Sequence, residues 1–316
     1  MKVTSYVLRR LLESIALILV ITVFTFVLIS SAPGGPSILL DPNMSPEDAA
    51  RLREVYGLDR PVHEQYILWL WQVLQGNLGF SLGVGRSVSE LISSALPATL
   101  LLSGAALLFA VLVAIPLGIL AAVNRNSWID QTVTVVSFFG LSLPVFWYGL
   151  MLIIFFSVVL DWLPAGGMYT PGQESFVDLI KHLLLPTLTL GTVNMAQLVR
   201  YTRSSMIGVL RQDYVRTARS KGIAETAVIY RHAFRTALVP VVTLLGLLIP
   251  RLVGGAAVTE SVFSWPGMGR LAVSAAFNRD YPTIMGITLI ISVIVIISNL
   301  IVDLLYARLD PRVSYG

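Results

Sequence analysis

The chain has 316 residues, of which 55% are hydrophobic and only 13% are charged. Soluble globular proteins carry about 25% charged residues, so the composition excludes an ordinary soluble fold and indicates a polytopic membrane protein. Cysteine is absent, which excludes disulfide bonds, thiolate nucleophiles and Cys-based metal sites. The net charge of +4 would permit nucleic-acid binding, but its distribution along the chain matters more, and we expect no nucleic-acid partner.

Six apolar segments are long enough to cross a bilayer, because a transmembrane helix needs roughly 20 mainly apolar residues. They are Leu11–Ala32, Thr99–Val123, Val133–Leu160, Leu183–Val199, Leu238–Val258 and Ile284–Leu305. We therefore predict an all-α polytopic membrane protein with about six transmembrane helices.

The first segment follows Arg9 and Arg10, as the apolar core of a signal peptide would. Its apolar run is longer than the roughly 7–15 residues of such a core. The stretch Ser30–Pro33 is also a poor cleavage site, because proline follows the alanine. We predict an uncleaved transmembrane helix here.

Lysine and arginine are concentrated on alternate connections between the segments. With both termini placed inside, the inner regions hold 14 of the 22 basic residues, eight of them between Arg200 and Arg235. The outer connections carry most of the others, but acidic residues dilute them. The positive-inside rule therefore predicts that both termini and the loop Arg200–Arg235 are cytoplasmic.

The outer loop from Pro33 to Pro97 is the largest polar region. Pro46–Leu58 predicts a short helix with Ser45 as its N-cap and Gly57 as its stop. A second helix is predicted over His63–Leu74, closed by Gly76. Its aromatic residues suit the membrane–water interface; they are Tyr66, Trp69 and Trp71.

No internal repeat or low-complexity linker interrupts the chain. We predict three parts: residues 1–32 as a tail and first transmembrane helix, 33–97 as an outer cap, and 98–316 as a five-helix core. The core contains the inner loop, residues 200–237.

The inner loop predicts a helix–Gly–helix hairpin. Its basic residues up to Arg219 mostly face one way, with an apolar side opposite; Gly222 breaks the helix, and a second short helix follows over Glu225–Phe234. Such a hairpin presents its turn as a knob that fits a cleft on a soluble partner. A basic element lying on anionic lipid is the alternative, but lipid binding alone does not require the break.

Polar residues inside transmembrane segments are candidates for function. Those that we select as pathway candidates are Asn194, Gln197, Thr243 and Arg251. Asn194 and Gln197 are three residues apart and share a helix face. Interhelical hydrogen bonding is the alternative role for such residues. Arg251 could also reach the outer surface or pair with an acid.

Several chemistries have no support in the sequence. No Gly-x-x-x-x-Gly-Lys-[Ser/Thr] motif occurs, so the chain lacks the usual cradle for ATP phosphates. No carboxylate or histidine cluster suggests a metal. Gly140-Leu141-Ser142 matches a pattern of intramembrane serine proteases, but the three histidines lie outside mid-membrane positions and cannot serve as its base.

Several motifs occur together in a fixed order. The inner loop holds Arg216-Thr217-Ala218-Arg219-Ser220-Lys221-Gly222, then His232-Ala233-Phe234-Arg235 and Pro240. Elsewhere the chain carries Ala32-Pro33-Gly34, Tyr56-Gly57-Leu58-Asp59-Arg60-Pro61, Gly76-Asn77-Leu78-Gly79-Phe80-Ser81, Pro97-Ala98-Thr99-Leu100, Thr259 to Arg270, Asn278-Arg279-Asp280-Tyr281-Pro282 and Asp310-Pro311-Arg312. With these motifs the chain resembles, over nearly its whole length, the permease subunits of ABC importers for dipeptides, oligopeptides and nickel.

The inner loop departs from the general pattern of that family. The pattern is Glu-Ala-Ala, three residues, Gly, nine residues, then Ile-x-Leu-Pro. Here Arg216-Thr217-Ala218 takes the place of Glu-Ala-Ala, and His232–Arg235 that of Ile-x-Leu-Pro, so the chain looks like the peptide branch's own version.

The resemblance implies a permease for di- or oligopeptides in the bacterial inner membrane. It implies four kinds of partner: a second, paralogous permease, two cytoplasmic ATPases that bind ATP-Mg, an external substrate-binding protein and the lipid bilayer. This chain would bind no cofactor and would not itself be an enzyme.

The resemblance also implies roles for particular residues. The loop 213–235 would couple to the ATPases through Arg216, Thr217, Ala218, Lys221, Gly222 and Ile223. Candidates for an outer gate or a binding-protein contact are Glu260, Trp265 and Arg270. A self-contained ion- or proton-coupled carrier is the alternative function, and it would call for paired acids or histidines in mid-span and related halves.

Overall fold

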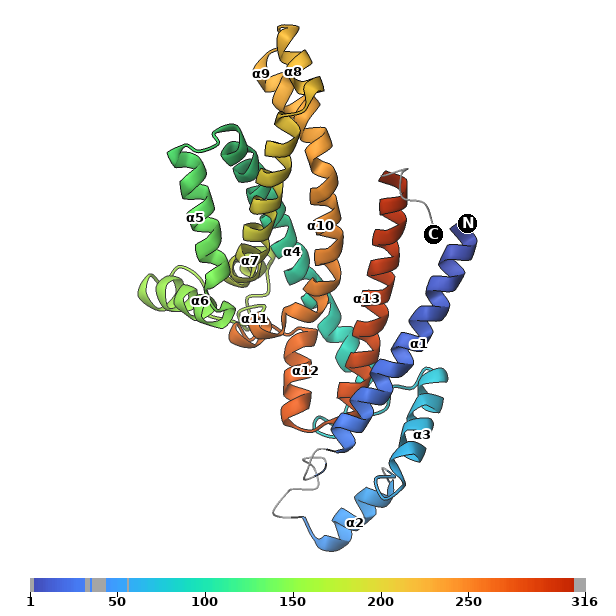
Figure 1. Ribbon diagram of the computed structural model, residues 1–316. Helices are drawn as coiled ribbons and strands as arrows, with labels where there is room; N and C mark the ends of the chain where they lie inside the picture. The colour runs from blue at the N-terminus through green and yellow to red at the C-terminus, as the bar shows by residue number, and fades with distance from the viewer. Residues whose placement is uncertain (1–2, 32–34, 36–43, 56, 310–316) are drawn as a thin grey trace. The chain divides into compact units, whose positions relative to one another are not determined.

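The computed structural model describes residues 3–31, 35, 44–55 and 57–309, and most of these are helical (Figure 1). In chain order the helices are α1 (Val3–Ser30), α2 (Pro46–Val55), α3 (Val62–Leu74), α4 (Val88–Val123), α5 (Trp128–Ser142), α6 (Val145–Leu152), the π-helix η2 (Ile153–Val159), α7 (Phe176–Leu210), α8 (Asp213–Ser220), α9 (Glu225–Ala227), the π-helix η3 (Val228–Ala233), α10 (Phe234–Gly255), α11 (Ala257–Val262), α12 (Met268–Phe277) and α13 (Tyr281–Leu309). The predicted all-α class is confirmed. Within the described ranges, extended pairing is confined to one isolated bridge between Phe80 and Ser87.

Five helical stretches are long and apolar enough to cross a membrane. They are Arg9–Ser30, Val88–Val123, Phe176–Leu210, Glu225–Leu248 and Tyr281–Asp303. Five of the six predicted segments lie on these stretches or overlap them. Several of the stretches extend beyond the apolar run, because helices continue through polar residues that a hydropathy argument does not register.

The third predicted segment, Val133–Leu160, is not one continuous helix. The structure divides it into α5 and the α6–η2 helix, which are bent by 100° relative to each other. Leu143 is extended, with φ −81° and ψ 133°, and Pro144 follows it at the start of α6. A residue before proline is driven out of the helical region by contact with the proline ring, which explains the break.

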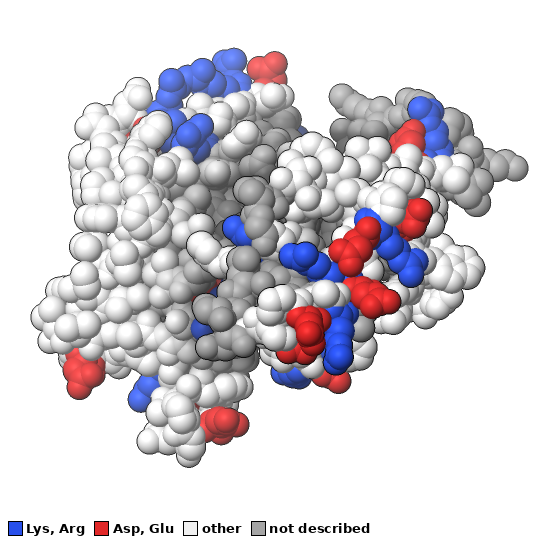
Figure 2. Space-filling view, turned by 90° about the horizontal axis from the view of Figure 1, so that it is seen from below, with Lys and Arg blue, Asp and Glu red and all other residues white. Residues whose placement is uncertain are grey.

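The outer polar helices form as the sequence predicts. The Oγ of Ser45 accepts a hydrogen bond from the backbone N–H of Asp48, so Ser45 caps α2. Gly57 and Gly76 follow α2 and α3 with positive φ angles of 64° and 81°, the conformation that ends helices most easily at glycine. Seen from below, charged side chains of both signs gather over this part of the chain in Figure 2; α2 alone contributes Glu47, Asp48 and Arg53.

The contacts divide the described chain into two compact units. Among the described residues, the first unit comprises those up to Thr99 together with Pro266–Leu300, and the second comprises Leu100–Trp265 with residues 301–309. The predicted three-part division follows the order of the chain rather than its packing, and it stays a prediction.

The first unit packs the start of α4 against α12 and α13. Its buried apolar cluster consists of Val88, Ile92, Ala95, Met268 and Ile287. In the same unit α3 lies along α1, where the Oη of Tyr66 is 3.0 Å from the Oγ1 of Thr22 and the ring of Tyr66 meets that of Phe26 edge-on.

The second unit is built on a close approach of α4 and α7. A Cβ atom added at Gly118 would lie 2.6 Å from the Cβ of Thr202, and one added at Gly191 would lie 2.6 Å from the ring of Phe109. Neither distance leaves room for a side chain, so both positions require glycine at this packing distance. Small residues of this kind let transmembrane helices pack closely.

Candidate functional site

The inner hairpin runs from the end of α7 to the start of α10 and lies at one end of the second unit (Figure 1). It differs from the prediction in two ways. The first helix is not continuous to Arg219, because α7 ends at Leu210 and α8 starts at Asp213. The second helix is not a separate element, because α9 runs through η3 directly into α10.

Gly222 lies at the turn between α8 and α9 with φ 72°. The N–H of Gly222 donates to the carbonyl of Arg219 at 3.0 Å, and the N–H of Ile223 donates to that of Ala218 at 3.4 Å. Together these two hydrogen bonds form a Schellman motif, which satisfies carbonyls at a helix end. The predicted helix break at Gly222 is confirmed, and nothing lies within 4 Å of a Cβ atom placed there.

An ion pair closes the same turn from the side. The guanidinium of Arg219 donates to both carboxylate oxygens of Glu225, with Nη2–Oε1 at 2.6 Å and Nε–Oε2 at 3.1 Å. Because that carboxylate accepts its hydrogen bonds, it raises the pKa of Arg219 above the usual value. The ion pair thus connects the two arms of the turn.

Beneath the turn, the hairpin packs on an apolar cluster that includes the C-terminal end of α4. Its buried members are Ile119, Ala122, Met206, Val209, Val215, Ala218, Val228, Ile229, Ala233 and Ala237. Ile223 packs against this cluster. Two polar contacts also fasten the hairpin to the start of α10: Tyr214 Oη donates to Thr236 Oγ1 at 3.1 Å, and Ser205 Oγ donates to the carbonyl of Ala237 at 2.9 Å.

This packing separates the predicted coupling residues into two groups. Arg216, Thr217, Lys221 and Gly222 are exposed, whereas Ala218 is buried and Ile223 is half-buried. Ala218 and Ile223 thus support the turn from inside, and a coupling role for the six residues stays a prediction. The exposed group is basic and surrounds a turn of fixed backbone geometry, as a docking surface requires.

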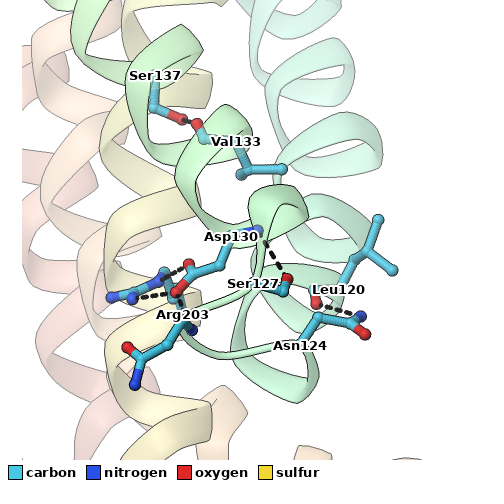
Figure 3. Close-up of polar contacts among 8 residues, drawn as sticks. Leu120, Asn124, Ser127, Asp130, Val133, Ser137 and Arg203 are labelled. Atoms are coloured by element: carbon cyan, nitrogen blue, oxygen red, sulfur yellow. Dashed lines mark hydrogen bonds and ion pairs between the residues drawn. The ribbon is translucent and has the colours of Figure 1, made fainter.

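Sequence reasoning missed the strongest polar link beneath this hairpin, between α5 and α7 (Figure 3). Asp130 accepts hydrogen bonds from Nε and Nη2 of Arg203, the latter at 2.7 Å, and from the backbone N–H of Asn126 at 2.9 Å. The side chain of Asp130 is 4% exposed and that of Arg203 is 30% exposed. Asp130 follows the N-cap Ser127 by three residues, and this capping pattern was the one available signal.

The pathway candidates lie on α7 and α10. Asn194 Nδ2 donates to the carbonyl of Leu190, and Thr243 Oγ1 donates to that of Val239, so both bond within their own helix. Gln197 is half-buried one turn after Asn194. Arg251 lies in α10, within the stretch 249–255 whose side chains fall outside the described residues. A role for these residues in the pathway stays a prediction.

The outer candidates do not share one environment. Glu260 and Trp265 are completely buried, so neither side chain offers surface to a binding protein in this conformation. Arg270, on α12, is exposed. A gate role for the three residues stays a prediction.

Motifs that are far apart in the sequence meet in the first unit. Asp280 is buried and accepts hydrogen bonds from Ser81 Oγ, from the N–H of Leu82 at 3.1 Å and from Thr283 Oγ1 at 2.8 Å. The Oγ1 of Thr99 accepts a hydrogen bond from the N–H of Met268 at 2.7 Å. These contacts give the matched motifs a structural role. The motifs Ala32-Pro33-Gly34 and Asp310-Pro311-Arg312 lie outside the described residues.

The described residues offer little support for a metal site or for catalysis by Ser142. No group of three or more His, Cys, Asp or Glu residues that could hold a metal ion occurs in the described part of the chain. Ser142 Oγ donates to the carbonyl of Phe138 at 2.9 Å. This is the ordinary behaviour of serine in a transmembrane helix.

Comparison with known proteins gives consistent results over both parts of the sequence. The family described as binding-protein-dependent transport system inner membrane component matches residues 114–315. The N-terminal family of the same membrane component matches residues 3–103.

Curated relatives cover nearly the whole chain. An oligopeptide transport system permease protein of Bacillus subtilis is 48% identical over 98% of this chain and 99% of its own length. A di/tripeptide transport system permease protein of Pseudomonas aeruginosa is 40% identical and the dipeptide transport system permease protein of Escherichia coli is 39% identical, each over 98% of this chain and 99% of its own length.

Solved structures support the fold. An inward-facing form of the MetNI methionine ABC transporter aligns with a TM-score of 0.56 at 17% identity, covering 71% of this chain and 96% of that chain. An amino acid ABC transporter aligns with a TM-score of 0.54 at 16% identity, covering 70% and 94%. With two family models that together span the chain and relatives up to 48% identical, this integral membrane protein belongs to the binding-protein-dependent transport system inner membrane components, the permease subunits of ABC importers.

Proposed function

We propose that the chain is a permease subunit of an ATP-driven importer of di- and oligopeptides. It forms half of the translocation pathway beside a second, paralogous permease. Two cytoplasmic ATPases, which bind ATP-Mg, dock on the inner hairpin, and an external binding protein delivers the substrate. Both termini lie in the cytoplasm. The relatives, named as oligopeptide and dipeptide permeases, support the peptide substrate.

The observation that carries the coupling role is the turn at Gly222. Arg216, Thr217 and Lys221 are exposed around it, while an apolar cluster and the ion pair Arg219–Glu225 hold it from inside and from the side. A turn that is both exposed and rigid transmits force when a partner grips it. It would also convert closure of the ATPases into rocking of α7 and α10.

The turn offers a sharp test of coupling. Proline at position 222 would remove the N–H that bonds to Arg219 and would require φ near −65° where the chain has 72°. Asparagine tolerates positive φ better than other residues with a side chain, so Gly222→Asn is the matched control. We expect Gly222→Pro to insert normally but to uncouple ATP hydrolysis from peptide uptake, and Gly222→Asn to stay coupled.

The experiment is partner capture combined with uptake. The C-terminus is tagged, membranes are solubilised in mild detergent, and co-purifying proteins are identified for the wild type and both variants. Recovery of an ATPase and a second permease with wild type and Gly222→Asn, but not of the ATPase with Gly222→Pro, is the expected result. A chain that purifies alone and takes up a radiolabelled dipeptide on a proton gradient without ATP would overturn the proposal in favour of a self-contained carrier.

A further inference from the structure

The α6–η2 helix does not continue the direction of α5. The two are bent by 100° at Leu143 and Pro144, and Figure 1 shows α6 running across the axis of α5. In the same unit, α6 lies at the end opposite α8 and α9 (Figure 1). If α5 crosses the bilayer, the α6–η2 helix therefore runs close to the membrane plane, in the leaflet opposite the inner hairpin.

The length of α5 sets the depth of this segment. With 15 residues and a rise of about 1.5 Å per residue, α5 reaches about 22 Å. The hydrocarbon core is about 30 Å thick, so an α5 that starts at the near edge of the core ends roughly 8 Å short of the far edge. Interfacial helices lie about 5–10 Å into the boundary between headgroups and acyl chains, which is the depth where α6 begins.

One face of the α6–η2 helix is apolar and exposed over its whole length. Pairs of exposed residues recur every four positions: Phe146 and Trp147, Leu150 and Met151, Ile154 and Phe155, Val158 and Val159, followed by Trp162. A π-helix has a wider turn than an α-helix, because its hydrogen bonds join residues five apart. The repeat of four therefore keeps the exposed residues on one side through η2.

The opposite face packs on protein. A Cβ atom added at Gly149 would lie 3.1 Å from the ring of Phe263 and 3.4 Å from the methyl group of Thr189. After η2, the following loop returns to the same place, where the N–H of Gly167 donates to the carbonyl of Phe263 at 2.8 Å. The segment is thus fixed from one side and bare on the other.

The side chains on the exposed face of the α6–η2 helix indicate what covers this face. No charged residue occurs between Gln131 and Leu160, so the face is unsuited to water. Helix–helix contacts in membranes favour Gly, Ala, Ser and Thr, which let backbones approach, whereas this face consists of bulky aromatic and branched side chains. Tryptophans stand near both ends of the face, and tryptophan prefers the membrane interface.

We propose that the α6–η2 helix is an interfacial helix that lies flat in the outer leaflet, with its bulky face in the acyl chains of lipid. The segment Val133–Leu160 is then one short crossing, α5, followed by a membrane-surface arm. The proposal rests on the membrane character of the chain and, for the choice of leaflet, on the cytoplasmic placement of the hairpin in the proposed function. It does not depend on the substrate or on ATP coupling.

The absence of cysteine makes the test direct. Single cysteines replace Leu150, Ile154 and Val158, which share the bare face. Each is spin-labelled in the full chain, together with its co-purifying partners, in vesicles of phosphatidylethanolamine and phosphatidylglycerol. The depth of each label is measured from its collision rates with oxygen and with a water-soluble nickel chelate. Matched labels at Val20, Phe24 and Leu28 of α1, which are also exposed and apolar, give the reference for a crossing helix.

The expected result is one common depth for the three labels, with high oxygen accessibility. Depths that change by about 12 Å from position 150 to 158, as a rise of 1.5 Å per residue requires, would mean a crossing helix and overturn the proposal. Equal depths with low oxygen accessibility would mean that protein covers the face and would equally overturn it. Peptide uptake by each variant verifies that the labelled protein is folded, and Met151→Cys replaces any variant that fails.

Discussion

Two helix ends with the same backbone geometry serve opposite purposes in this chain. The end of α8 has Gly222 at φ 72°, and the end of α12 has Arg279 at φ 48°; in each, the next residue bonds back to the helix, as Asp280 N–H does to Ala275 at 2.9 Å. After the first turn, Ile223 packs on the apolar cluster and leaves Gly222 exposed. After the second turn, Asp280 enters a buried cluster of hydrogen bonds. The buried turn joins segments that are far apart in the sequence, and the exposed turn leaves its glycine on the surface.

The largest loss of stability is expected for a substitution at Asp280, in the buried turn. Asp280→Ala removes the acceptor of Ser81, Leu82 and Thr283, and unsatisfied buried donors cost about 1–3 kcal/mol each. We expect a loss of about 3 kcal/mol in the free energy of unfolding, measured as a lower Tm of the detergent-purified chain. Asp213→Ala, at a side chain that is 98% exposed, is the control. An unchanged Tm for Asp280→Ala would mean that the cluster does not hold the first unit together.

A smaller effect is expected where burial is partial, at Asp130 and Arg203. Breaking a fully buried ion pair costs about 3–5 kcal/mol, but Arg203 is 30% exposed, so we expect about 2 kcal/mol for Asp130→Ala. In a double-mutant cycle with Arg203→Ala, the double variant should lose little more than either single variant, because the two side chains bond to each other. Additive losses would contradict a direct coupling of α5 and α7 through this pair.

A substitution at the exposed turn should lower the free energy of unfolding even less, but it should also reduce the coupling of uptake to ATP hydrolysis. Nothing crowds a Cβ at Gly222, so Gly222→Ala meets only the strain of a positive φ, about 1 kcal/mol. Gly76 offers a matched control, with φ 81° and equally open space. We expect Gly76→Ala and Gly222→Ala to lower Tm alike. Only Gly222→Ala should slightly reduce the peptide taken up per ATP hydrolysed, because alanine holds a positive φ less well than the asparagine of the coupled control. Equal uptake in both variants would argue against a special role for the inner turn.

The smallest effect is expected for the ion pair Arg219–Glu225. Both side chains are largely exposed, and exposed pairs contribute about 0–1 kcal/mol. We expect Glu225→Gln to lower Tm slightly at low ionic strength and not at all in high salt, where exposed charges are screened. A large loss that persists in high salt would show that the pair braces the turn more strongly than its exposure implies.

The sequence predicts most of the helices because apolar runs and helix stop signals are local. Ser45 acts through its own side chain and Gly57, Gly76 and Gly222 through their own backbone, and each lies where predicted. The bend at Pro144 was harder to predict, because a proline after an apolar run permits either a kink in one helix or a complete turn between two.

The contacts that the sequence could not predict join distant residues. Asp280 lies 199 positions from Ser81, and Arg203 lies 73 from Asp130; no periodicity relates positions so far apart. The predicted coupling residues differ from one another only in burial. Ala218 and Arg216 belong to one motif, yet Ala218 is buried inside the hairpin and Arg216 is exposed.

The close approach of α4 and α7 at Gly118 and Gly191 limits how the two helices can move relative to each other. Where backbone meets side chain at van der Waals distance on two levels of the same helix pair, α4 and α7 cannot slide or roll past each other without a collision. We therefore expect the two helices to move together, with the inner hairpin packed against one end of the pair. A displacement of the hairpin would then move α4 and α7 together rather than one past the other.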